Sequence, residues 1–240
     1  MVEYKKETTT FKTPFGKSIV IQEGDGYADK VFAKRVKKTF EVIPDFLAHV
    51  VVSIDGKKDP GRDGILNLKV PDQEWISIEN YKFNYGNILR LFNICPKCGE
   101  PIHTVKDLSE LEVTPLPKEF QGQDDPVYLI KLPKTKVSTS VGFLNGHQEQ
   151  LLMGLAAAGN EDPNQADFQV LRELDGKPPT YEDVINLPQG DHFAIREARE
   201  KLICGYKAVA TISCQSCSYK EVSNFLLTRG FLLPTRMLQD

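Results

Sequence analysis

The amino-acid sequence predicts an α+β protein that is a tandem duplication of one small α+β module. One observation is that a Cys-x-x-Cys knuckle occurs twice in the 240 residues. Another is that apolar residues in each half switch between the alternation of strands and the longer period of helices. We therefore expect two modules, over residues 13–117 and 127–234, each with one knuckle. Residues 1–12 are polar and terminal, so we expect a flexible N-terminal arm there.

The residues that repeat are those that shape the backbone. Asp-Gly favours a tight turn, because Gly accepts positive φ and Asp bonds to its own backbone. An Asp just before a helix is a natural N-cap, and a Gly just after one is a natural end. The matched positions are Asp55 and Asp175, Asn67 and Asn186, Asp72 and Asp191, and Gly86 and Gly205. We interpret these residues as architectural, because caps and turns require such types in any fold.

The first module is expected to open with a hairpin, and residues 18–21 predict one of its strands. Residues 41–52 carry an apolar stripe that predicts a helix with one buried face. Residues 73–85 predict a second helix, with the matched Asp as its cap and the matched Gly as its end. Residues 88–94 are long enough for one strand, which leads into the first knuckle.

The second module repeats this order. Residues 137–143 predict a hairpin strand, and residues 148–158 and 167–174 predict helices with a buried face. Residues 192–204 predict the helix that ends at the matched Gly, and residues 207–212 predict the strand into the second knuckle. The same order of elements in both halves is what the duplication requires.

Composition and charge exclude several classes of protein. Hydrophobic residues make up 40% and charged residues 26% of the chain, which is typical of a globular protein. The net charge of −3 argues against a dedicated nucleic-acid binder, which usually has a basic face. The N-terminus lacks the apolar region of a signal peptide, and no apolar run is long enough to span a membrane.

The cysteines predict a metal site. Two knuckles supply four thiolates, the ligand set of a closed tetrahedral zinc, and paired knuckles indicate metal more than a disulfide framework. We therefore expect one structural Zn²⁺ per chain, in a zinc-ribbon-like site of four cysteines that joins the modules. The expected ligands are Cys95, Cys98, Cys214 and Cys217. Four thiolates leave no open position for water, so such a metal would stabilise structure and would not catalyse.

Other interpretations of these residues remain open. His103 follows the first knuckle closely enough to be a ligand, although the second module has no matching histidine. A redox dithiol would need a thioredoxin-like context. Cys204 is expected to be a buried apolar residue. The other histidines do not cluster in the sequence with acids or a nucleophile; they are His49, His147 and His192. We expect no catalytic or cofactor-binding residues, and therefore not an enzyme.

The chain resembles the baseplate hub protein family of T-even-type contractile-tailed phages, often called the phage base plate protein family. The resemblance includes Leu-Pro-x-x-Lys at 132–136 and Asn-Gly-x-x-Glu at 145–149. It also includes the run Asp-Gly-Lys, Asn-Leu-x-x-x-Asp, Gly and Cys-x-x-Cys, which occurs at 55–98 and again at 175–217. The resemblance implies a structural or assembly component of the hub, made in the host cytoplasm and then part of the virion tail baseplate. Its implied partners are other baseplate hub and tail proteins, including the tape-measure protein.

Two further expectations concern contacts with partners. The alternative function is a zinc-ribbon nucleic-acid-binding or regulatory protein, for which the basic run at 34–38 is the candidate contact. For an assembly protein, residues 1–12 and the apolar residues 225–240 are the candidate docking segments. The competing interpretation of the C-terminal segment is that it packs on the second module as part of the core.

Overall fold

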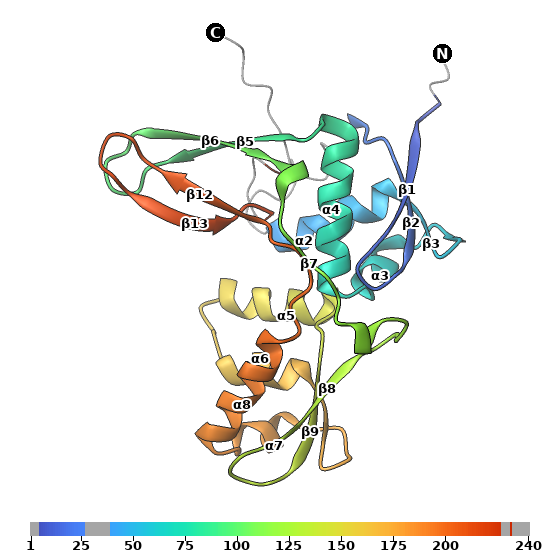
Figure 1. Ribbon diagram of the computed structural model, residues 1–240, viewed down its shortest axis with the longest axis vertical. Helices are drawn as coiled ribbons and strands as arrows, with labels where there is room; N and C mark the ends of the chain where they lie inside the picture. Colours follow the sequence, from blue (N-terminus) through green and yellow to red (C-terminus); the bar gives the residue numbers. More distant parts are fainter. Residues whose placement is uncertain (1–4, 27–38, 227–230, 232–240) are drawn as a thin grey trace.

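The structure is a computed structural model that describes residues 5–26, 39–226 and 231. It confirms the predicted α+β class, because helices alternate with antiparallel strands (Figure 1). The elements of the first half are β1 (Thr8–Lys12), β2 (Ser18–Gln22), α2 (Thr39–Val50), β3 (Val51–Ile54), β4 (Lys57–Lys58), α3 (Gly61–Leu66), α4 (Val70–Tyr85), β5 (Ile88–Ile94) and β6 (Pro101–Asp107).

A connecting segment and the second half follow. The connection contains η1 (Leu108–Glu110), β7 (Val113–Thr114) and η2 (Lys118–Phe120). The second half consists of β8 (Val127–Lys131), β9 (Ser138–Gly142), α5 (Gly146–Ala157), α6 (Pro163–Val170), β10 (Leu171–Leu174), α7 (Tyr181–Ile185), α8 (Gln189–Glu200), β11 (Gly205–Tyr206), β12 (Val209–Ser213) and β13 (Lys220–Asn224). None of the helices that the structure describes is long and apolar enough to cross a membrane.

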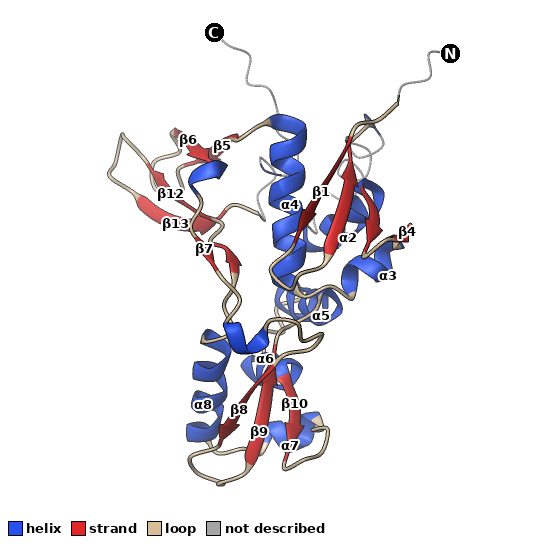
Figure 2. Cartoon of the chain, turned by 45° about the vertical axis from the view of Figure 1, so that its right-hand side comes forward, coloured by secondary structure: helices blue, strands red, loops and turns tan. Residues whose placement is uncertain are grey.

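The described elements follow the same order in the two halves. In each half, an opening hairpin is followed by one or two helices and a third antiparallel strand. Two more helices and a last hairpin come after that strand. The sheet order is β1-β2-β3-β4 in the first half and β10-β9-β8 in the second, with a register shift where the third strand pairs in each. The turns after β3 and β10 hold Asp55 at φ 50° and Asp175 at φ 53°. Figure 2 shows the two sheets in red in separate parts of the molecule.

The helix that was expected over residues 192–204, with its end at Gly205, stops at Glu200, and Gly205 begins β11. Two other expected local structures are also different in the fold. Residues 1–12 were expected to be a flexible arm, but Thr8–Lys12 form β1 and pair along their whole length with β2. A helix was expected over residues 167–174, but α6 ends at Val170 and the chain continues as β10. Pairing with a neighbouring strand satisfies the backbone groups in both places, and polarity of the sequence does not predict that pairing.

Asp72 and Asp191 are not the N-caps that the sequence suggested. Both lie in the first turn of their helices, α4 and α8, as the third helical residue, and both are almost completely buried. The Asp72 carboxylate accepts a hydrogen bond from the Phe15 N–H at 3.1 Å. The Asp191 carboxylate accepts from the N–H groups of Lys134 at 2.7 Å and Thr135 at 3.0 Å. Each Asp therefore fastens the opening hairpin of its half to the start of a helix.

Three apolar clusters form the main core. One is built around β2, β3, α2 and α4 of the first half, and one around β9, α6 and α8 of the second. The third lies under the last hairpins and combines residues of both halves, with Leu89 and Leu91 against Ala208 and Ala210. Phe225 and Phe231 are buried in this third cluster, at 0% and 4% exposure. The described C-terminal residues are therefore core, and the docking role suggested for residues 225–240 is not supported there.

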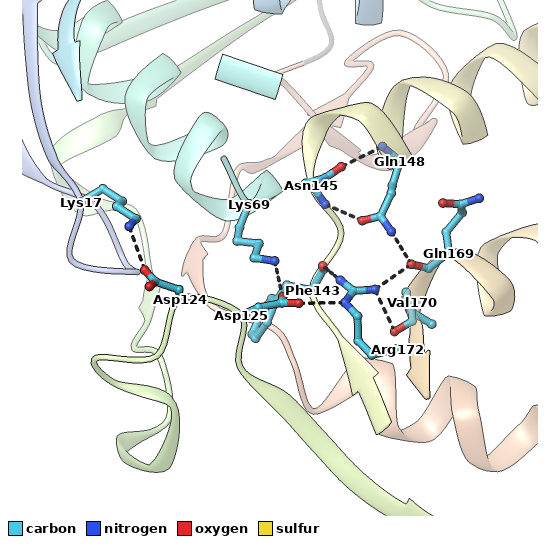
Figure 3. A network of polar contacts seen from close by, with 10 residues as sticks. All are labelled: Lys17, Lys69, Asp124, Asp125, Phe143, Asn145, Gln148, Gln169, Val170 and Arg172. Carbon is cyan, nitrogen blue, oxygen red and sulfur yellow. Dashed lines mark hydrogen bonds and ion pairs between the residues drawn. The ribbon is translucent and has the colours of Figure 1, made fainter. Parts of the chain in front are cut away.

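Polar contacts also join the halves (Figure 3). The Val70 N–H donates to the Leu144 carbonyl at 3.0 Å, and the Gly146 N–H donates to the Leu68 carbonyl at 3.2 Å. In the connecting segment, the Asp125 carboxylate accepts from the Lys69 ammonium of the first half and from the Arg172 guanidinium of the second. These two cations lower the pKa of Asp125 in spite of its partial burial, which favours the charged form that holds both halves.

Candidate metal centre

The four knuckle cysteines lie at the tips of two hairpins that pack together. The strands β5 and β6 form one hairpin, and β12 and β13 form the other. Figure 1 shows the two hairpins side by side, with their loops at the same end. Ile102 of β6 and Ile212 of β12 are buried together behind the cysteines, at 3% and 6% exposure. Apolar packing thus aligns the two knuckles before any metal is considered.

Each knuckle is a tight turn closed by a backbone hydrogen bond. The Cys95 N–H donates to the Glu100 carbonyl at 2.8 Å, and the Cys214 N–H donates to the Tyr219 carbonyl at 2.9 Å. The residue after the second cysteine has positive φ in both, and the first knuckle uses a glycine there, Gly99, at φ 79°. The turn brings both sulfurs of a knuckle to the same side, which is the geometry that a shared metal ligand set needs.

The four sulfurs form a compact cluster. The Sγ atoms of Cys95 and Cys217 are 3.5 Å apart, and those of Cys98 and Cys214 are 3.6 Å apart. All four Sγ atoms lie within 4.8 Å of one another. Ligands about 2.3 Å from a tetrahedral zinc are separated by about 3.8 Å, which fits these distances. The cysteines are free thiols, and their separations are far longer than a disulfide bond of about 2.05 Å.

The surroundings of the cluster favour at least one thiolate. Burial by itself raises the pKa of Cys95, but the N–H groups of Cys98 and Lys97 and the neighbouring thiols lower it to about 7. Cys95 and Cys214 are buried, whereas Cys98 is exposed at the end of the hairpin. A bound cation supplies the positive charge that allows neighbouring thiols to ionise together. The four residues can therefore hold a metal ion that is reached from the hairpin tips.

The structure also places the other candidate ligands. Among the described residues, the metal-ligating group is limited to the four knuckle cysteines. His103 does not belong to this group. It lies on the exposed face of its hairpin, opposite to the face that buries Ile102, and its ring contacts Phe92 with centroids 5.2 Å apart. Cys204 is buried as expected, and burial raises the pKa of its thiol to about 12. With four sulfurs as ligands, a tetrahedral ion would have no free position for a substrate.

One buried polar cluster was missed in the sequence. His192 was expected to be isolated from acids, but its Nδ1 lies 2.8 Å from the Asp167 carboxylate. Arg196 donates to the same carboxylate, at 2.9 Å from Nη2. Asp167 is completely buried, and these two partners compensate for its burial. Helix spacing places His192 and Arg196 on one face of α8, but nothing in the sequence indicates that α6 brings Asp167 to that face.

The comparisons with known proteins supply no role for the metal centre. No protein-family model matches the chain, and the comparisons with curated proteins and with solved structures also gave no match. The chemistry of the site therefore follows from its own geometry: four clustered thiols, donated by two hairpins, that can hold one metal ion.

Proposed function

We propose that this protein is a structural or assembly component of a contractile phage tail baseplate hub, and that it acts through protein–protein contacts. The observation that carries the proposal is the meeting of four thiols from hairpins of both halves. A metal held there links the halves and makes one rigid body, as a scaffold for assembly requires. The tail and hub context comes from the resemblance of the sequence motifs to those of the phage base plate protein family.

The metal in this proposal is one structural Zn²⁺ per chain. Thiolate ligands in a tetrahedral set favour zinc over the hard cations, which prefer oxygen ligands. The sulfur separations support it, because they agree with those around a tetrahedral zinc. In this proposal the protein is not an enzyme, and its metal, saturated by cysteine, serves to stabilise the hairpins.

The partners in this proposal are other baseplate hub and tail proteins, including the tape-measure protein. The protein is made in the host cytoplasm during assembly and becomes part of the virion tail baseplate. The alternative, a zinc-ribbon nucleic-acid-binding or regulatory protein, relied on the basic run at residues 34–38, which lie outside the described residues. The net charge of −3 supports protein partners over nucleic acid.

Elemental analysis of the purified chain tests the metal. We expect zinc at about one equivalent per chain, and loss of that zinc in Cys98→Ser. The matched control is Cys204→Ala, which removes the cysteine outside the cluster and should retain zinc. Absence of zinc from the wild-type protein, or two equivalents, would contradict the shared site.

Tail assembly tests the function. Deleting the coding gene in the virus should stop assembly before baseplates form, and supplying Cys204→Ala should restore it while Cys98→Ser should not. Purified protein mixed with hub and tape-measure proteins should co-elute with at least one of them. Normal tails in the deletion, seen by electron microscopy, would exclude the proposed role.

A further inference from the structure

The first hairpin exposes an apolar face on the side that the second hairpin does not cover. Strand alternation places Leu89 and Leu91 inward and their neighbours outward. Along β5 and β6 the outward side chains include Ile88, Phe92, Ile94 and Val105, which are 40%, 50%, 57% and 64% exposed. These four residues, together with Arg90 between Ile88 and Phe92, are named the apolar hairpin face. A cluster of exposed apolar side chains on a rigid hairpin is typical of an interaction site.

The second hairpin provides an internal comparison. In the register set by the knuckles, Phe92, Ile94 and Val105 correspond to residues of β12 and β13. Those residues are Thr211, Ser213 and Asn224. Exposed large apolar residues on the described part of β12 and β13 are limited to Val222. The apolar side chains of the first hairpin are therefore not required by the hairpin fold or by the knuckle, since the second forms both without them.

Arg90 gives the face its charge. Its side chain is on the exposed side of β5, opposite Val105 in the pairing, and it has no ion-pair partner among the described residues. The acid of β5 and β6 that the pairing places on the same side of the hairpin is Asp107, which pairs with Ile88. The Asp107 carboxylate already accepts from Ser109, at 2.8 Å from the N–H and 2.6 Å from the hydroxyl. Within the part of the chain that the structure describes, Arg90 is therefore a cation without an ion-pair partner, and its neighbours along β5 and β6 are apolar.

We infer that the apolar hairpin face binds a peptide segment of a partner protein that is apolar and carries one carboxylate for Arg90. Burial of the four apolar side chains supplies the binding energy, and the guanidinium–carboxylate pair sets the position of the segment. The inference deepens the proposed function, on which it rests for the partner being a tail-assembly protein. The chemistry of the face is independent of that identity.

Two other occupants fit the face less well. A second copy of the chain would bring an unpaired Arg90 from each side into one apolar interface without a carboxylate for either, which is costly. Single-stranded nucleic acid stacks on aromatic rings along a basic groove, but the face is mainly aliphatic. The whole first hairpin is also nearly balanced in charge, since its charged residues are Arg90, Lys97, Glu100, Lys106 and Asp107.

A displayed library of random peptides, long enough to form a strand or a short helix, is the probe that tests the face. Zinc-loaded wild-type protein is the bait, and the triple variant Phe92→Thr, Ile94→Ser and Val105→Asn is the matched control. The variant carries the residues of the second hairpin, so it should keep its zinc and its melting temperature. We expect wild-type protein to select apolar peptides with one Asp or Glu, and the triple variant to bind them at least about tenfold more weakly.

Arg90→Glu is the second variant, and it keeps the test decisive if the triple variant does not fold. The substitution reverses the charge at an exposed position and creates no cavity. The variant should therefore select apolar peptides with a basic residue in place of apolar peptides with an acidic one. Enriched peptides that lack an acid, or that bind both baits equally, would overturn the inference. A dimer in sedimentation that the triple variant abolishes, or oligothymidine binding that Arg90→Glu abolishes, would assign the face to another occupant and overturn it too.

The two proposals fail separately. If acidic apolar peptides bind as expected but tails assemble without the protein, the face stands and the baseplate role is excluded. If tails require the protein but the triple variant supports assembly and no peptide is selected, the baseplate role stands and the face is excluded.

Discussion

Glu74 and Glu149 line one small cavity of about 40 Å³ between α4 and α5. Burial raises the pKa of both carboxyl groups to about 7, and the proximity of Glu149 adds to the shift of Glu74. In the folded state these two carboxyl groups therefore stay protonated to a higher pH than in the unfolded chain, in which Glu ionises near pH 4.5. Their contribution to stability is complete below about pH 4.5 and is lost as the pH rises through 7. The cavity is thus a place where neutral pH weakens the fold.

We predict that Glu74→Gln stabilises the protein above pH 7, by on the order of 1 kcal/mol, because the amide needs no proton to be neutral. The free energy of unfolding, from urea titrations with zinc present, should fall less between pH 5 and pH 8 than in the wild-type protein. Glu182→Gln, at an exposed glutamate, is the control and should leave the pH dependence unchanged. If the free energy of unfolding of Glu74→Gln depends on pH as steeply as that of the wild-type protein, Glu74 ionises normally.

The residue after each knuckle offers a second test at the residue scale. Gly99 and Ser218 both have positive φ, at 79° and 58°, and only glycine adopts it without strain. We predict that Ser218→Gly raises stability by about 0.5–1 kcal/mol and that Gly99→Ala lowers it by a similar amount. No heavy atom lies within 4 Å of a Cβ added at Gly99, so the change would report backbone strain alone. Equal stability of the variants and the wild type in urea would contradict the strain.

At the scale of elements, α5 depends on close contact at its first residue. A Cβ added to Gly146 would lie 2.3 Å from the Gln73 amide and 3.0 Å from the Leu66 backbone, both in the first half. We predict that Gly146→Ala destabilises the protein by about 1–3 kcal/mol, because α5 must move away from α3 and α4. Gly154→Ala lies in the same helix and meets nothing within 4 Å, so it should instead stabilise by up to about 1 kcal/mol. Thermal melts of the two variants give the comparison, and a neutral Gly146→Ala would mean that the junction is loose.

At the scale of the whole molecule, the fold has two separate sheet units and one shared hairpin unit (Figure 1). We predict that chelating the metal frees the hairpins and leaves the sheet units folded, because metal binding contributes directly to the folding energy of the elements that it links. Hydrogen exchange should accelerate in β5, β6, β12 and β13 and stay slow in β2 and β9. The Cys204→Ala variant with zinc bound is the control and should exchange like the wild type. If hydrogen exchange accelerates equally in all strands, the protein unfolds as one cooperative unit. If exchange does not change, the metal is not needed for the stability of the hairpins.

The sequence by itself determined what depends on local chemistry. The hydrophobic periods predicted the α+β class, because strand and helix repeats are properties of short segments. Residues 18–21, 88–94 and 137–143 were correctly assigned to strands for this reason. The knuckle spacing also identified the four cysteines that cluster, since two thiols in one tight turn can share a metal wherever the turn lies. The identity of the metal stays a prediction.

The tertiary structure decided what depends on which segments meet. Asp72 and Asp191 are N-cap types by sequence, yet their carboxylates bind hairpin turns that lie far away in the chain. Asp167 and His192 pair because two helices pack, and Phe231 is buried because the last hairpins leave an apolar layer beneath them. The exposure of Phe92 likewise follows from which side of its hairpin the second one covers. Such pairings depend on the packing of separate elements, and no local pattern of residues specifies them.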